Sequence, residues 1–380
     1  MSAVQRLIAP RIARDLERKM VFLTGPRQAG KTTVAMQLAA KVPGAQVLNW
    51  DVLADRRVML AQSWLPDAKL LVFDELHKMP NWKPWLKGVF DGRAPGQSIL
   101  VTGSARLEAF RQSGESLAGR FFVWHLHPLT VRELQTAQGI SCEDALTRLI
   151  ERGGFPEPLL AEHPEDAQRW RQLYLDGLIR DDILEFSRIG ELNAMRHFVA
   201  LLRERVGSPV SLASIARDLQ VSPTTLGRYL DILEALHVVF IVRPFHRNIA
   251  RALLKEPKVY FFDVGLVKAD EGVRFENACA AMLLAHANFL QDSAGRDITL
   301  HHVRNKEGRE IDFVLCENGE PLRFVECKWG DPAVPPYLAR IAAQFPNAAC
   351  SVLVRHLRQP EQRGRVKVEH AAQWLSELAI

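Results

Sequence analysis

The sequence predicts a mixed α/β fold divided into several domains, and three observations predict it. A glycine-containing loop stands between an apolar run at residues 20–23 and a helical pattern at 34–39, which is the strand–loop–helix order of a phosphate-binding loop. Further short apolar runs alternate with helical segments over the first third of the chain, as in a parallel sheet. Near the other end, two strand-like runs flank Asn318-Gly319, which is typical of a hairpin. At 380 residues, the chain exceeds what one hydrophobic core usually supports.

The loop fits the pattern G-x-x-x-x-G-K-[ST], and Thr33 follows it; the matching residues are Gly25, Pro26, Arg27, Gln28, Ala29, Gly30, Lys31 and Thr32. Its two glycines let the backbone turn its N–H groups toward phosphate oxygens at the start of a helix. Lys31 is expected to place a positive charge on the β- and γ-phosphates, and the Thr32 hydroxyl to ligate Mg²⁺. The sequence therefore predicts that ATP and Mg²⁺ bind at residues 25–33.

An acidic pair, Asp74-Glu75, follows the apolar run at residues 70–73, which reads as a strand buried on both faces. Asp74 is expected to hold the Mg²⁺ shell, and Glu75 to orient or deprotonate the attacking water. The next strand-like run ends in hydroxyl residues, and either Thr102 or Ser104 could sense the γ-phosphate. This arrangement favours ATP hydrolysis over nucleotide sensing alone.

Arg120 directly precedes another strand-like run at residues 121–124. It is a candidate arginine finger, supplied by a neighbouring subunit to neutralise charge on the transferring phosphoryl group. Arg106 and Arg111 compete for this role, and a surface salt bridge is the alternative for Arg120. A finger acting between subunits implies a homo-oligomer, with a ring as the expected arrangement.

The middle of the chain is predicted to be helical over residues 143–205, where an ATPase would carry a helical lid. A compact helix-turn-helix pattern follows at 208–245, with Ser222-Pro223 as the start of its second helix. The strand-like run at 237–242 and the basic residues after it complete a pattern that resembles a winged helix.

This winged-helix pattern predicts contact with DNA. Thr224, Thr225 and Arg228 would face the groove, while Arg243 and Arg247 would belong to a basic wing. The alternative is that the module serves as a packing or oligomer contact, because such modules often have that role. DNA is therefore an expected partner.

The C-terminal hairpin carries charged residues whose pairing depends on its loop. A two-residue loop at Asn318-Gly319 would pair Asp312 with Val325 and put Glu326 on the other face. A three-residue loop at 318–320 with a bulge sets Asp312 opposite Glu326 instead. We expect the second register because it brings the two carboxylates together.

Two facing carboxylates are hard oxygen ligands that suit Mg²⁺ or Mn²⁺. With Glu276 as a third carboxylate and Lys328 on the face of Glu326, they could activate water and clamp phosphate oxygens. The alternative is that these charges simply alternate outward on a half-exposed hairpin. The sequence thus predicts a metal site at Glu276, Asp312 and Glu326, with Lys328 as a catalytic residue.

The composition indicates which partners, cofactors and cell compartment to expect. The net charge of +5 is compatible with nucleic-acid binding but is not specific to it. The five cysteines include no C-x-x-C pair, which indicates neither a disulfide framework nor a zinc site. No apolar run suits a membrane helix, and the N-terminal segment has no secretory core. We therefore expect a cytoplasmic protein with no membrane partner.

Across essentially its whole length the chain resembles the prokaryotic AAA-type ATPases that carry a C-terminal domain of unknown function. The resemblance rests on the phosphate loop and on these motifs: Asp74-Glu75-Leu76-His77-Lys78, Ser116-Leu117-Ala118-Gly119-Arg120, Gly153-Gly154-Phe155-Pro156-Glu157, Tyr260-Phe261-Phe262-Asp263-Val264-Gly265-Leu266 and Phe275-Glu276-Asn277.

In that family the C-terminal region resembles the restriction-endonuclease-like PD-(D/E)XK fold. Asp312 matches the aspartate of that motif, Glu326-Cys327-Lys328 its E-x-K, and Glu276 the glutamate of the first helix. Ile311 stands where the motif has proline. The resemblance implies a metal-dependent nuclease-like domain.

The expected organisation is an AAA-type P-loop ATPase core at 1–145, a helical lid at 146–206, a winged-helix-like domain at 207–262 and a PD-(D/E)XK nuclease-like domain at 263–380. Two functions follow from it. In the first, an ATP-hydrolysing enzyme acts on DNA, and its C-terminal domain cleaves phosphodiesters. In the second, an ATPase switch uses the winged-helix and nuclease-like domains only to bind DNA or a protein partner.

Overall fold

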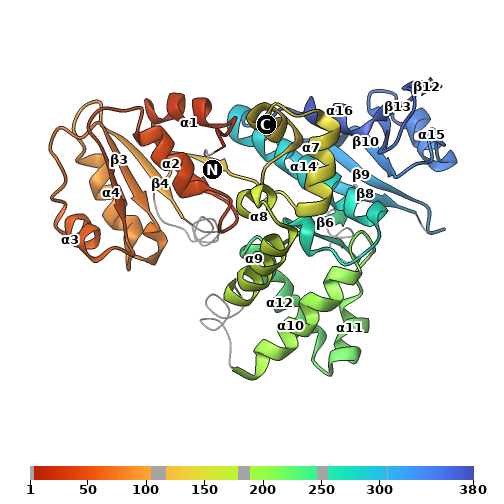
Figure 1. The fold of residues 1–380 in the computed structure, drawn as a ribbon, viewed down its shortest axis with the longest axis horizontal. Helices are drawn as coiled ribbons and strands as arrows, with labels where there is room; N and C mark the ends of the chain where they lie inside the picture. Colours follow the sequence, from red (N-terminus) through yellow and green to blue (C-terminus); the bar gives the residue numbers. More distant parts are fainter. Residues whose placement is uncertain (1–3, 104–116, 179–188, 246–255, 306) are drawn as a thin grey trace. The chain divides into compact units, whose positions relative to one another are not determined.

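A computed structural model describes residues 4–103, 117–178, 189–245, 256–305 and 307–380 of the chain (Figure 1). It divides into two compact units. The first consists of Met1–His127 with Ala235–His237, and the second of Pro128–Glu234 with Val238–Ile380. Ser104, Arg106, Arg111 and Arg247 from the sequence predictions lie outside the described residues.

The first unit is built on a five-stranded sheet with the order β2-β3-β4-β1-β5, in which all neighbouring strands are parallel. Its strands are β1 (Met20–Thr24), β2 (Ala45–Asn49), β3 (Leu70–Asp74), β4 (Ser98–Thr102) and β5 (Phe121–His125). Both β1 and β3 are buried along their whole length, as inner strands of a parallel sheet should be. The predicted parallel α/β sheet is confirmed.

The helices of this unit are α1 (Ala9–Leu16), α2 (Lys31–Ala39), α3 (Leu53–Ala61), the 3₁₀ turn η1 (Leu76–Lys78) and α4 (Trp82–Asp91). The strand register decides what meets at the carboxyl edge of the sheet. Asn49 pairs with Asp74, and Leu23 pairs with Thr102. The side chains that end β2, β3 and β4 therefore lie beside the loop that follows β1.

The second unit begins with a series of helices, and further helices lie between and after its strands. They are α6 (Val131–Gln138), α7 (Cys142–Arg152), α8 (Pro156–Leu160), α9 (Pro164–Gly177), α10 (Ile189–Glu204), α11 (Leu212–Leu219), α12 (Pro223–Ala235), η4 (Val264–Leu266), α14 (Glu271–Ala294), α15 (Pro336–Gln344) and α16 (Ala371–Ser376). Ser222 begins α12 as predicted, because its hydroxyl accepts a hydrogen bond from the Thr225 N–H at 3.0 Å. The Phe198 and Tyr229 rings pack 6.4 Å apart between α10 and α12.

An eight-stranded sheet runs through the second unit in the order β12-β13-β11-β10-β9-β8-β6-β7. Its strands are β6 (Val239–Pro244), β7 (Lys258–Phe261), β8 (Ile298–Arg304), β9 (Glu310–Glu317), β10 (Glu320–Lys328), β11 (Ala349–Val354), β12 (Glu361–Arg363) and β13 (Val366–His370). Strand β6 pairs with β7 and also with β8. The strands that follow the helix-turn-helix thus continue into the sheet of the C-terminal hairpin, and α14 packs against β7, β8, β9 and β10.

The hairpin loop corrects one expectation. Glu317 pairs with Glu320, so the loop has two residues rather than the three that we predicted. Asn318 and Gly319 both have positive φ values, 52° and 80°, which suit a tight hairpin turn with the twist of the strands.

The predicted register of the hairpin is nevertheless right. The pairing shifts by one residue between Pro321 and Arg323, after the turn, so that Val325 stands opposite Phe313. This bulge supplies the extra residue that we had assigned to the loop. Asp312 consequently lies opposite Glu326, and its N–H donates to Glu326 Oε2 at 3.4 Å.

Candidate active sites

The phosphate loop of the first unit has the backbone that its sequence predicts. Gly25 has φ 134°, and a Cβ atom there would lie 2.3 Å from the Leu126 carbonyl oxygen, so no larger residue fits. Gly30 precedes α2 in the left-handed region at φ 99°. Lys31 Nζ donates to the carbonyl oxygens of Gly25 and Pro26 at 2.9 and 2.6 Å. Burial lowers the pKa of Lys31 to about 8, although Glu75 and Asp74 act in the opposite direction.

Arg6 supports this loop from the N-terminal segment. Its guanidinium is buried and donates to the Ala29 carbonyl at 3.0 Å and to the His127 carbonyl at 2.6 Å. It therefore ties the loop to the segment after β5. The sequence offers no signal for this role, because the arginine stands outside any motif.

Asp74 is the centre of a hydrogen-bonded network at the carboxyl edge of the sheet. Its Oδ2 atom accepts from the Thr32 hydroxyl at 2.9 Å and from Asn49 Nδ2 at 3.0 Å. The Thr102 hydroxyl donates to its Oδ1 atom. Thr32 and Asp74 thus present adjacent oxygen atoms, the donor type that Mg²⁺ prefers, and they fit the ion that the sequence predicts. The sequence analysis did not identify Asn49 as a member of this network.

Glu75 directly follows β3 in a strained conformation. Its φ and ψ angles are 56° and 27°, in the left-handed region that costs a non-glycine residue about 1–3 kcal/mol and recurs at active sites. Its carboxylate lies 3.2 Å from Lys78 Nζ and 3.7 Å from His77 Nε2. Lys78 also reaches Asp51 at 2.5 Å. Lys78 thus holds the Glu75 carboxylate just after the end of β3.

Arg120 forms an ion pair inside its own chain. Its Nε and Nη2 atoms donate to the two carboxylate oxygens of Asp91 at 2.8 and 3.2 Å. It precedes β5, whose first residue pairs with Met20 at the edge of the sheet opposite the phosphate loop. Five strand residues span about 16 Å, so Arg120 is far from the loop of its own chain.

The second unit brings together the charged residues of the hairpin. Asp312 Oδ2 accepts a hydrogen bond from the Cys327 N–H at 2.8 Å. Lys328 Nζ lies 2.8 Å from Glu326 Oε1. Both carboxylates are nearly inaccessible, with 9% of Asp312 and 6% of Glu326 exposed. The outward-facing alternative therefore does not describe these two residues.

Lys258 is a member of this cluster that the sequence analysis missed. Its Nζ atom lies 3.4 Å from Glu276, 3.4 Å from Glu310 and 3.8 Å from Asp312, and its side chain is 1% exposed. Glu276 also accepts a hydrogen bond from the Tyr260 hydroxyl at 2.6 Å. The available signal was a lysine at the start of the otherwise apolar strand β7.

Burial dominates the protonation of the cluster. It raises the pKa of Glu276 to about 7, an effect that Asp312 increases and Lys258 opposes. It also raises the pKa of Glu326 to about 7, with Asp312 acting in the same direction and Lys328 against it. Burial would lower the pKa of Lys258, but the surrounding carboxylates, Glu276 first, raise it.

The donor set fits a divalent ion in part. Asp312 and Glu326 are facing carboxylates, which suit Mg²⁺ or Mn²⁺. Glu276 is held by Lys258 and Tyr260, so it fits as outer support for these two residues. Among the residues that the structure describes, no group of three histidine, cysteine or acidic side chains is placed to hold a metal ion.

The predicted DNA-facing residues lie on α12 and β6. Thr224 and Arg228 are exposed, whereas Thr225 shares a 2.8 Å hydrogen bond with Ser222 at the helix start. Arg243 belongs to β6, beside His301 of β8. In the part of the chain that the structure covers, no helix is long and apolar enough to cross a membrane.

Comparison with known families assigns the first unit to a class. Residues 17–135 match the model of an AAA domain, 143–276 match a domain of unknown function (DUF8612), and 271–372 match a second domain of unknown function (DUF4143). With the phosphate loop and the Asp74 network, the first match defines a P-loop ATPase domain of the AAA class. That sequence prediction is confirmed.

The chain belongs to the same family as the uncharacterized protein Rv2008c of Mycobacterium tuberculosis, with 30% identity over 364 residues that cover 90% of this chain and 80% of the relative. It is also similar to the uncharacterized protein MJ1544 of Methanocaldococcus jannaschii, at 23% identity over 62% of this chain and 60% of the relative. Among solved structures, the Walker-type ATPase PABY2304 of Pyrococcus abyssi aligns with a TM-score of 0.45 and 16% identity, over 72% of this chain and 96% of that one.

Proposed function

We propose that the protein hydrolyses ATP and acts on DNA, and that its C-terminal cluster cleaves phosphodiesters with a divalent metal. The observation that carries the nuclease part is the burial of two facing carboxylates, Asp312 and Glu326, beside Lys328. Burying such a pair is costly unless a cation or protons compensate it.

For ATP, the residues have separate tasks. The backbone N–H groups of the loop and Lys31 bind the phosphates, and Thr32 and Asp74 would hold Mg²⁺. The ion would supply charge neutralisation at the β- and γ-phosphates. Asn49 and Thr102 fix the orientation of Asp74. Glu75 orients the attacking water and accepts its proton.

For the C-terminal cluster, Asp312 and Glu326 would hold Mg²⁺ or Mn²⁺, which would supply an activated water and charge stabilisation. The Cys327 N–H and Lys328 fix the orientation of the two carboxylates. Lys328 is half-buried, and its ammonium would stabilise the negative charge that develops on the attacked phosphate. DNA would reach the protein through the exposed residues of α12.

One observation favours the second candidate, an ATPase switch that binds DNA or a protein partner without cleaving. Lys258 lies among Glu276, Glu310 and Asp312, and Lys328 pairs with Glu326. These lysines compensate the carboxylates without a metal ion. The cluster could then serve as a rigid platform.

Nicking of supercoiled plasmid separates the two candidates. The full chain is incubated with plasmid and Mg²⁺ or Mn²⁺, with and without ATP. We expect nicking that EDTA stops and that Asp312→Asn and Lys328→Met abolish. Glu317→Gln is the matched control, because Glu317 lies on the same hairpin but pairs with Arg296 at 2.7 Å. Absence of cleavage under all conditions, with ATP turnover intact, would favour the binding platform.

A further inference from the structure

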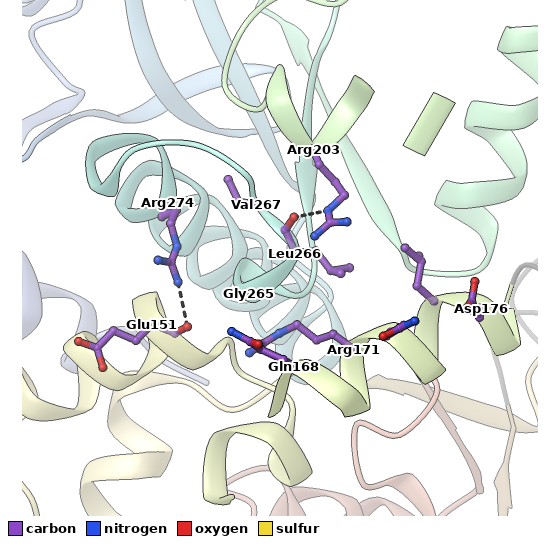
Figure 2. A pocket seen from close by; sticks show the side chains of 11 residues that line it. Glu151, Gln168, Arg171, Asp176, Arg203, Gly265, Leu266, Val267 and Arg274 are labelled. Atoms are coloured by element: carbon purple, nitrogen blue, oxygen red, sulfur yellow. Dashed lines mark hydrogen bonds between the residues drawn. The ribbon is translucent and has the colours of Figure 1, made fainter. Parts of the chain in front are cut away.

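A pocket of about 500 Å³ lies within the second unit, and none of the residues assigned to the two candidate sites lines it (Figure 2). It is formed by α7, α9, α10, α14 and the segment around η4. Its lining residues are Glu151, Gln168, Arg171, Gln172, Leu175, Asp176, Arg203, Gly265, Leu266, Val267 and Arg274. Figure 2 shows the three arginines grouped around the Gly265–Val267 segment.

Each arginine is anchored by part of its guanidinium. Arg171 Nε donates to Asp263 Oδ2 at 3.1 Å, and its Nη2 donates to the Arg152 carbonyl. Arg203 Nε donates to the Leu266 carbonyl at 2.6 Å. Arg274 Nη2 donates to the carbonyl oxygen of Glu151 at 2.8 Å and to that of Ile150. A guanidinium has five N–H donors, so each of the three keeps further donors for a ligand.

Two of the three guanidinium groups of the pocket have no carboxylate at ion-pair distance among the residues that the structure describes. Arg171 is paired with buried Asp263, but neither Arg203 nor Arg274 has a described carboxylate within 4.0 Å. Asp176 lies 3.6 Å from Arg196 instead. Glu151 directs its carboxylate away from the arginines (Figure 2). Two guanidinium charges are therefore left without an ion-pair partner in the described chain.

Burial makes these two charges receptive to an anion. The Nε atom of Arg274 is buried, and among described atoms it has no hydrogen-bond partner. Burial also lowers the pKa of Arg203, which reflects the loss of hydration around its charge. The acceptor oxygens of a ligand would replace the hydrogen bonds to water that the guanidinium groups lose on burial.

Two motifs without an assigned role shape this pocket. A Cβ atom at Gly153 would lie 1.8 Å from Asp263 Oδ1, and one at Gly265 would lie 2.1 Å from Arg171 Nε. Glycine at both positions makes room for the Arg171–Asp263 pair. The motifs that start at Gly153 and Tyr260 thus meet in space and fix Arg171 at the pocket wall.

We propose that this pocket binds a phosphate monoester. Its two negative charges match the two guanidiniums that lack an ion-pair partner, and arginine forks bind phosphate oxygens in pairs. Gln168 and Gln172 offer amide groups for a polar remainder of the ligand. The volume falls in the usual range for small-molecule sites. The phosphate belongs either to a free phosphorylated metabolite or to the 5′ end of a nucleic acid strand.

The test is calorimetric titration of the full chain with two probes, ribose 5-phosphate and a 5′-phosphorylated dT oligonucleotide. We expect one of them to bind, and its identity tells the source of the phosphate. Arg203→Gln and Arg274→Gln should each weaken binding about tenfold, the size of one charge-assisted contact.

Arg169→Gln is the matched control, since Arg169 lies on the same helix as Arg171 but is 79% exposed. Arg203→Lys keeps the positive charge but loses the forked guanidinium, so it should weaken binding less than Arg203→Gln. It replaces Arg203→Gln in the test if that variant unfolds. Absence of binding of both probes at millimolar concentration overturns the proposal. Loss of binding in Arg169→Gln overturns it as well.

Discussion

Replacement of Lys258 by methionine tests the electrostatics of the C-terminal cluster. The lysine is 1% exposed and lies 3.4–3.8 Å from Glu276, Glu310 and Asp312. Methionine fills a similar volume but leaves buried carboxylates without their cation. Breaking a buried ion pair in this way costs about 3–5 kcal/mol. For a unit of this size that corresponds to a fall in melting temperature of about 6–20 °C.

The assay is thermal unfolding of the full chain with EDTA, and then with Mg²⁺ or Mn²⁺. We expect the metal ion to recover much of the loss in Lys258→Met, because it can replace the missing positive charge between the carboxylates. Lys268→Met, at an exposed lysine of the same unit, should change little. An unchanged melting temperature in Lys258→Met would refute the electrostatic reasoning, and a loss that metal does not recover would refute the metal site.

Three further predictions concern single residues. Glu75→Gln should slow ATP turnover about a hundredfold or more while ATP affinity is kept, since only water activation is lost; wild-type turnover would remove Glu75 from the mechanism. Arg120→Ala should lower ATP turnover about a thousandfold, whereas Asp91→Ala, which removes the ion-pair partner of Arg120, should not. Similar turnover in the two variants would exclude the arginine-finger role and leave Arg120 with its ion pair to Asp91 alone. Burial and the Lys258 charge lower the pKa of His302 to about 3, so this histidine stays neutral in the folded protein while it becomes protonated in the unfolded chain below about pH 6.5. As the pH falls from about 6.5 to 3, the free energy of unfolding should therefore decrease by at most about 1.4 kcal/mol per pH unit. Urea unfolding of His302→Phe should show a flatter decline over that range, and an equal slope would contradict the assignment.

Local sequence patterns predicted the features that depend on residues close together in the chain. The phosphate loop at residues 25–33 and the pair Asp74-Glu75 each follow from the residue spacing of their own motif. The loop lies between a strand and a helix, and the acidic pair lies at the end of a strand, as we expected. Asn49 reaches Asp74 only through the pairing of β2 with β3, which no local pattern encodes. Lys258 is a similar case, because its carboxylate partners come from α14 and β9.

The hairpin shows how a correct result can arise for the wrong local reason. Asn318-Gly319 forms the two-residue turn that this dipeptide favours, and the register shift falls instead between Pro321 and Arg323. The facing of Asp312 and Glu326 was predictable from the chemistry of paired carboxylates. The position of the bulge had a signal that the prediction did not use, because Pro321 stands at the shift and proline inside a strand typically marks an edge or a bulge.

The most direct test of the account is steady-state phosphate release from ATP by the wild-type chain and by Lys31→Ala. We expect Mg²⁺-dependent turnover in the wild type and its loss in Lys31→Ala, because the buried ammonium that would meet the phosphates is gone. Lys41→Ala, at an exposed lysine just beyond the other end of α2, should retain wild-type turnover. Equal turnover in Lys31→Ala and the wild type would contradict the assignment of the ATP site.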